Sequence, residues 1–183
     1  GYWIWRPYIL NKKFQEIEDD DIIIFLDAGC TINHKGKNKF YEYINMFNNT
    51  DNGIISIQYN NGDEEHPHLE EKYWSTNEIF KYFNIEFDNK IINSCQYLGG
   101  VLILKKNKHS RLFIDTFLKV LEDNPYLFTD KYNNNQLPEF IDNRHDQSIS
   151  SIIRKRIDSI VLNSSEIYSD NSLFKVTRIC DLI

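Results

Sequence analysis

Alanine is almost absent from this sequence: it occurs once among 183 residues, at Ala28, whereas asparagine and isoleucine are abundant. An AT-rich coding sequence produces such a skew, so asparagine-rich stretches need no functional explanation. Cysteine is rare as well, and Cys30, Cys95 and Cys180 are odd in number, far apart and without a CxxC pair. We therefore expect reduced, buried thiols, and neither a disulfide framework nor a thiolate metal centre.

Positive charge and long apolar runs are also scarce. Lys and Arg total 21 against 27 Asp and Glu, and the net charge of −6 argues against a nucleic-acid partner. The longest uninterrupted apolar run, Ile22 to Leu26, is far below the roughly 20 residues of a membrane helix. With no signal peptide visible, we expect a cytoplasmic protein. The chain starts at Gly1 rather than Met, so we expect the natural N-terminus to be missing.

What is present suffices for one packed domain over residues 1–183, since 41% of the residues are hydrophobic. Continuous β-branched runs predict strands at 22–26, 54–58, 101–104 and 160–162, the first of them buried on both faces. Helical spacing of apolar residues predicts helices at about 8–17, 38–48, 75–83, 110–122 and 146–157. Strands that alternate with helices favour an α/β sheet covered on both faces, with ligands at the carboxyl ends of its strands.

Asp27 stands at such a strand end. One interpretation is structural, because aspartate often terminates a strand or caps a helix. The functional interpretation is that its carboxylate meets a metal-bound diphosphate or a substrate hydroxyl, since Mg²⁺ and Mn²⁺ prefer hard oxygen ligands. Gly29, two residues later, would let the backbone approach a bulky ligand closely.

Four short segments carry a family resemblance over about residues 1–155. In chain order they read YWIWRPYI (residues 2–9), FLDAGC (25–30), GGVLIL (99–104) and RHDQS (144–148). Together they resemble the nucleotide-diphospho-sugar transferases with the GT-A glycosyltransferase fold. The resemblance implies a Rossmann-like domain with a mixed, mostly parallel central sheet and helices on both faces. It also implies that the first strand or strands, which grip the nucleotide base, precede Gly1 and are missing from this chain.

The resemblance further implies an activity: transfer of a sugar from a UDP- or GDP-sugar to a hydroxyl of a glycan, lipid or protein acceptor, as in glycan or polysaccharide biosynthesis. Asp27 matches the first position of the DxD motif and would be the metal ligand for Mn²⁺ or Mg²⁺, while Gly29 replaces the second acid. Asp146 matches the acid that acts as general base in inverting members. The donor would be bound by Trp5, Arg6, Asp27, Ala28 and Gly29, and the donor-sugar and acceptor pocket would be lined by Gly99, Gly100, His145 and Gln147.

Several of these residues have simpler interpretations. The indoles of Trp3 and Trp5 could stack on a sugar or base beside Arg6, which could pair with a phosphate, or they could pack in the core. The Gly99-Gly100 pair could be a β-bulge, and Asp146 could be a helix N-cap. The basic run at 154–156 lies at a helix C-terminus, where the helix dipole favours positive charge, so we interpret it as structural.

Two other functions remain open from the sequence. The segment around Asp27 also resembles the haloacid-dehalogenase phosphatase signature, in which a second aspartate two residues later is the acid/base. Gly29 stands at that position, so the proton donor of that chemistry is lacking. The other alternative is a catalytically silent module that binds a sugar nucleotide.

Overall fold

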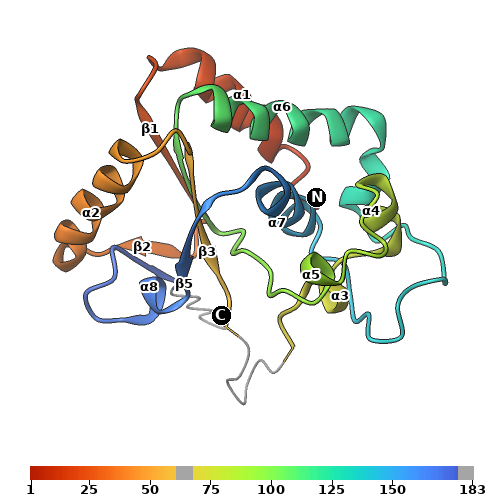
Figure 1. The fold of residues 1–183 in the computed structure, drawn as a ribbon. Coiled ribbons are helices and arrows are strands. Elements are labelled where there is room, and N and C mark those ends of the chain that lie inside the picture. Colours follow the sequence, from red (N-terminus) through yellow and green to blue (C-terminus); the bar gives the residue numbers. More distant parts are fainter. Residues whose placement is uncertain (61–67, 177–183) are drawn as a thin grey trace, which may run out of the picture.

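The computed structural model describes residues 1–60 and 68–176 (Figure 1). Its strands are β1 (Ile22–Leu26), β2 (Cys30–Ile32), β3 (Ile54–Gln58), β4 (Val101–Lys105), β5 (Ile160–Asn163) and β6 (Phe174–Val176). Its α-helices are α1 (Arg6–Glu16), α2 (Lys37–Asn48), α3 (Glu71–Trp74), α4 (Asn77–Tyr82), α5 (Asn89–Ile92), α6 (Lys108–Asp123), α7 (Asp146–Ile157) and α8 (Ser165–Tyr168). Short 3₁₀ turns lie at η1 (His34–Gly36) and η2 (Pro125–Phe128).

Four strands form a mixed central sheet in the order β1-β4-β3-β5. The β3·β5 ladder is parallel, whereas β1 and β3 each pair antiparallel with β4. The predicted mixed α/β sheet is therefore confirmed, but the prediction of mostly parallel ladders is wrong. The reason is that β4 lies between two strands that run in one direction and itself runs in the other. A second, two-stranded sheet, β2·β6, was not predicted.

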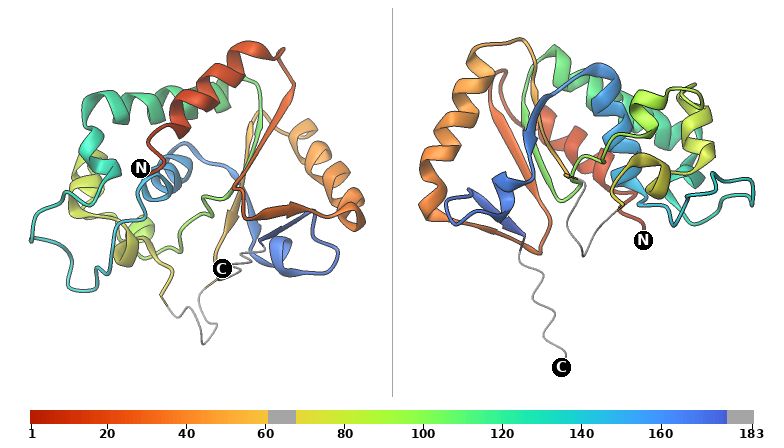
Figure 2. Two further views of the ribbon diagram at one scale, coloured as in Figure 1. Left: turned by 180° about the vertical axis from the view of Figure 1, so that it is seen from behind. Right: turned by 60° about the horizontal axis from the view of Figure 1, so that its bottom comes forward.

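The central sheet has a hydrophobic core on each face. Alternate residues of β4 point to opposite cores: Leu102 and Leu104 pack with α1, α6 and α7, while Val101 and Ile103 pack with α2 and α8. Figure 2 shows the sheet between these two groups of helices. The prediction of helices on both faces is confirmed.

Strand β1 departs from its prediction. All of its residues are only half-buried, although its two faces contribute to both cores. Within the described part of the chain it pairs with β4 alone and is therefore an edge strand. A continuous apolar run indicates covered faces but does not show whether both edges of a strand are paired.

The described helices are all too short or too polar to cross a membrane. In the part of the chain that the structure describes, Cys30 and Cys95 form no disulfide and are half-buried, whereas buried thiols were expected. Cys180 lies outside the described residues.

Candidate functional site

Arg6 lies at the centre of the candidate site. It is the first residue of α1, where Pro7 fits the fixed backbone angle of a helix start, and it is 3% exposed. Its guanidinium donates to Asp27 Oδ1 at 2.9 Å and to the carbonyl oxygen of Gly99 at 3.0 Å, and it forms an ion pair with Asp146. One buried side chain thus joins residues from all four motifs. The same guanidinium stacks 4.5 Å from the ring centre of Phe25.

Asp27 is the solvent-facing acid of the pair. It directly follows β1, its backbone N–H donates to the carbonyl of Gly100 at 2.9 Å, and its carbonyl accepts from Cys30 at 2.9 Å. Its side chain is 38% exposed, against 4% for the side chains of Arg6 and Asp146. Asp27 therefore holds the end of the strand in place and also presents a carboxylate to solvent, so the structural and functional interpretations are compatible.

Asp146 is the buried acid of the pair. It is the first residue of α7, and the N-cap position is occupied by His145, so the N-cap interpretation of Asp146 is wrong. Burial raises the pKa of Asp146 from 3.8 to about 6; the charge of Arg6 lowers this pKa, and that of Asp27 raises it. Its Oδ2 atom faces Arg6 as an ion pair but accepts no hydrogen bond from the described residues. A buried carboxylate with a pKa near neutrality can take up a proton.

Two arginines fix the backbone that enters β4. The carbonyl of Leu98 accepts from Arg154 at 3.1 Å, and the next carbonyl, that of Gly99, accepts from Arg6 at 3.0 Å. Arg154 is fully buried, and its remaining donors reach the backbone of Ser150 and the hydroxyl of Ser56. Burial lowers the pKa of Arg154 to about 10. Consecutive carbonyls are thus held from opposite sides by charged hydrogen bonds, which makes this segment rigid.

Both glycines are required by close side chains. A Cβ atom on Gly99 would lie 2.8 Å from Oε1 of Gln147, which accepts the Gly99 N–H at 3.2 Å. A Cβ atom on Gly100 would lie 2.9 Å from Oδ2 of Asp27. The pair immediately precedes β4 and lets two functional candidates approach the backbone, which a plain β-bulge would not require.

Aromatic residues neighbour Arg6 and Asp146 along the chain. The ring of His145 lies 5.0 Å from that of Tyr2 and 6.2 Å from that of Trp3, and its Nε2 atom lies 2.7 Å from Asp130 Oδ1. Trp5 lies 6.3 Å from the ring of Phe25 and is 43% exposed. The indoles are therefore not packed in the core. The remaining candidates, Ala28 and Gly29, form the turn between β1 and β2, with Ala28 exposed.

The donor set around Asp27 is small for a metal ion. Across residues 1–60 and 68–176 no three His, Cys, Asp or Glu side chains come close enough to hold one. Asp27 Oδ1 and Asp146 both face Arg6, so Asp27 Oδ2 is the oxygen left for a cation. Mg²⁺ and Mn²⁺ are often held by one carboxylate together with substrate phosphates and water. Asp27 could contribute one oxygen to such a metal, but the described residues alone do not form a metal centre.

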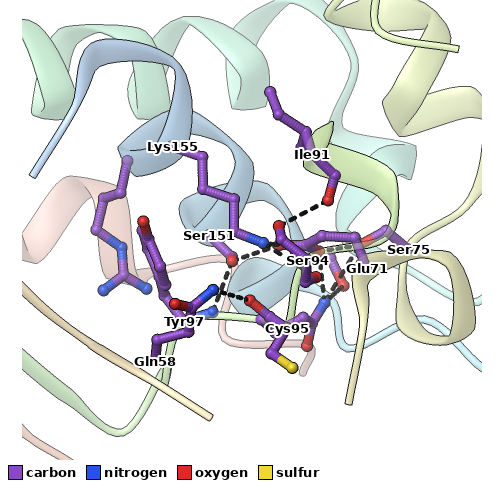
Figure 3. Close-up of polar contacts among 12 residues, drawn as sticks. Gln58, Glu71, Ser75, Ile91, Ser94, Cys95, Tyr97, Ser151 and Lys155 are labelled. Atoms are coloured by element: carbon purple, nitrogen blue, oxygen red, sulfur yellow. Dashed lines mark hydrogen bonds and ion pairs between the residues drawn. The ribbon is translucent and has the colours of Figure 1, made fainter. Parts of the chain in front are cut away.

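A buried polar network behind this site was missed by the sequence interpretation (Figure 3). Glu71, which is fully buried, pairs with Lys155 at 2.6 Å and accepts from Gln96 at 2.9 Å. Gln96 in turn accepts from Gln147 at 2.9 Å, which connects the network to the Gly99 backbone. The basic run at 154–156 lies in the last turn of α7, as predicted, but Arg154 and Lys155 turn inward to buried partners, which the helix-dipole interpretation did not predict.

A signal for this inward orientation was present in the sequence. The helix carries Ser148, Ser150 and Ser151 among its isoleucines. A helix with small or apolar residues on most of its faces is largely buried, so its charged residues also face the interior. Lys155 also borders an open pocket of about 690 Å³, together with Gln58, Tyr97 and Asp158. No residue that the sequence selected for the site lines this pocket.

Comparison with protein-family models, with curated proteins and with solved structures finds no match for this chain. The GT-A resemblance therefore remains a prediction from the four motifs. The evidence for a site is the geometry itself: a half-exposed acid, a buried acid of raised pKa, and an arginine that joins both to a fixed glycine backbone.

Proposed function

We propose that this protein is a glycosyltransferase that transfers a sugar from a UDP- or GDP-sugar to a hydroxyl acceptor. The observation that carries the proposal is the contact of Arg6 with Asp27, Asp146 and the Gly99 carbonyl. Residues far apart in the chain, selected because they resemble one family's donor and base positions, converge on one guanidinium. If these residues had only separate structural roles, they would not need to meet at one side chain.

Asp146 is the general base in this proposal. As the acceptor oxygen bonds to the anomeric carbon and the nucleoside diphosphate leaves, the hydroxyl proton passes to the Asp146 carboxylate. A base works best when its pKa lies near the working pH, and burial places that of Asp146 at about 6. Arg6 keeps the carboxylate oriented and stabilises its charged form.

Asp27 is the donor-side acid. Its exposed carboxylate would hold Mg²⁺ or Mn²⁺ through Oδ2, with the diphosphate oxygens as further ligands, and that metal would supply positive charge to the leaving group. Arg6 binds Oδ1 and fixes the carboxylate plane. The rigid Gly99-Gly100 backbone lies against this group, because a Cβ atom on Gly100 would touch Oδ2.

Calorimetric titration of the full-length protein, which includes the base-binding strands expected to precede Gly1, with UDP- and GDP-sugars, with and without Mn²⁺, tests the donor half of the proposal. We expect saturable binding that Asp27→Asn weakens about tenfold, while Asp19→Asn, which alters an acid 89% exposed, leaves it unchanged. Asp146→Asn should abolish transfer and keep donor affinity. Equal loss of both by this variant would argue against a base.

The two alternatives give different results in the same experiments. A phosphatase would hydrolyse p-nitrophenyl phosphate and bind no sugar nucleotide. A silent binding module would bind the donor and show neither transfer nor donor hydrolysis across a panel of acceptors.

A further inference from the structure

Two exposed aromatic rings pack on the half-buried ring of His145, next to Asp146. Tyr2 and Trp3 pack against the ring of His145, at centroid distances of 5.0 and 6.2 Å. Tyr2 is nevertheless 40% exposed and Trp3 46% exposed, although indole and phenol rings gain most free energy when they are buried. We refer to Tyr2, Trp3 and His145 as the aromatic platform.

The backbone beneath the platform is held in unfavourable conformations. Six non-glycine residues in the described part of the chain have positive φ, and three of them are Tyr2 (61°), Trp3 (51°) and His145 (54°). Bulky residues rarely adopt such angles, because Cβ meets the carbonyl oxygen at a cost of roughly 1–2 kcal/mol each. Strain of this kind concentrates where side chains must be placed for a function.

The rings are also fixed in orientation. His145 Nε2 lies 2.7 Å from Asp130 Oδ1, and the His145 N–H donates to Asn143 Oδ1 at 3.1 Å. On the other side, the N–H of Arg6 donates to the carbonyl of Trp3 at 2.9 Å, which closes the turn that carries the indole. The platform is thereby tied to Arg6, and through it to Asp146.

We infer that the aromatic platform is the acceptor subsite and that the acceptor is a saccharide. A pyranose ring presents a flat face of C–H groups that stacks on aromatic rings, and hydroxyl groups at its edge that donate to carboxylates. Asp130, whose side chain is 54% exposed, lies at the border of the platform and offers such an acceptor. This inference rests on the proposed transferase function and names its acceptor class.

The position of the platform favours the acceptor over the nucleotide base of the donor. Its rings contact His145, which directly precedes the proposed base Asp146. Trp5, by contrast, lies beside Phe25, which leads into the donor-side acid Asp27. A sugar stacked on Trp3 is therefore on the side of the site where a hydroxyl must lose its proton.

Screening on an oligosaccharide array, followed by calorimetric titration of the glycans that bind, tests this inference. Trp3→Ala should weaken glycan binding about tenfold, and Trp3→Phe should retain most of it, because a ring remains. Tyr41→Ala is the matched control: Tyr41 is 50% exposed on α2, on the opposite face of the sheet, and its loss should change nothing. Trp3 is half-exposed, so thermal unfolding of Trp3→Ala should resemble that of the wild type.

UDP and GDP are titrated in parallel against the full-length protein, which separates the two proposals. If neither nucleotide binds, the proposed function fails. If no glycan binds, or if Trp3→Ala binds the selected glycan as tightly as the wild type, the acceptor assignment is overturned while the transferase proposal stands. A loss of UDP or GDP affinity in Trp3→Ala would assign the platform to the nucleotide instead and would equally overturn it.

Discussion

Replacing Asp146 by asparagine removes a buried ionisation while keeping the shape of the side chain. Burial raises the pKa of Asp146 from 3.8 to about 6, so between these pH values the folded protein holds the proton more tightly than the unfolded chain does. Its stabilising effect is therefore complete below about pH 4 and is lost as the pH rises through 6. At about 1.4 kcal/mol for each tenfold change in proton affinity, the loss amounts to about 3 kcal/mol.

Urea denaturation at about pH 4, 5, 6 and 7 measures this difference without the charge screening of guanidinium chloride. The free energy of unfolding of Asp146→Asn, relative to the wild type, should rise by about 3 kcal/mol across this range. The attraction of Arg6 is already included in this figure, because the charge of Arg6 lowers the pKa of Asp146 that sets it. Carboxyl groups of lowered pKa, such as Glu78, act in the opposite direction in both proteins and cancel. If the free energy of unfolding differs between wild type and variant by the same amount at about pH 4 and at about pH 7, the reasoning is refuted.

Three further outcomes are expected. Glu71→Gln leaves the buried Lys155 without its partner and should lower the free energy of unfolding by about 3–5 kcal/mol in urea titrations. Gly100→Ala pushes the Asp27 side chain aside, so donor affinity measured by calorimetry should fall about tenfold, while the melting temperature changes by only a few degrees. Phe117→Ala, at the centre of the core under α6, should cost about 3–5 kcal/mol by the same urea assay, and a cost below about 1 kcal/mol would contradict the packing described.

Elements with a strong apolar pattern could be predicted from the sequence, and the others could not. Strands β1 and β3 begin and end as predicted, because each has three β-branched isoleucines among five residues that lie between turns. The pairing of β2 with β6 joins Cys30–Ile32 to Phe174–Val176. Strands of this length carry too few residues for a periodic signal, and their partner is distant in the chain. The reversed direction of β4 also leaves no mark on its composition.

The candidate site was predictable in its members but not in its arrangement. Asp27, Asp146 and the glycine pair were selected from motifs, and the structure brings them together around Arg6. The sequence placed Arg6 at a phosphate, whereas its guanidinium lies buried between two carboxylates. Whether a charged side chain faces solvent or an interior partner depends on which distant acids the fold brings near, and local spacing does not encode that.

The carbonyls of Leu98 and Gly99, held by Arg154 and Arg6, have a consequence for how ligands would be selected. Peptide units anchored in this way cannot flip or retreat without breaking a charged hydrogen bond, so the free and occupied forms should share one backbone here. Discrimination by the Gly99-Gly100 backbone would then follow from steric fit alone. A ligand that reaches this backbone with one extra methyl group would be rejected rather than accommodated by adjustment of the protein.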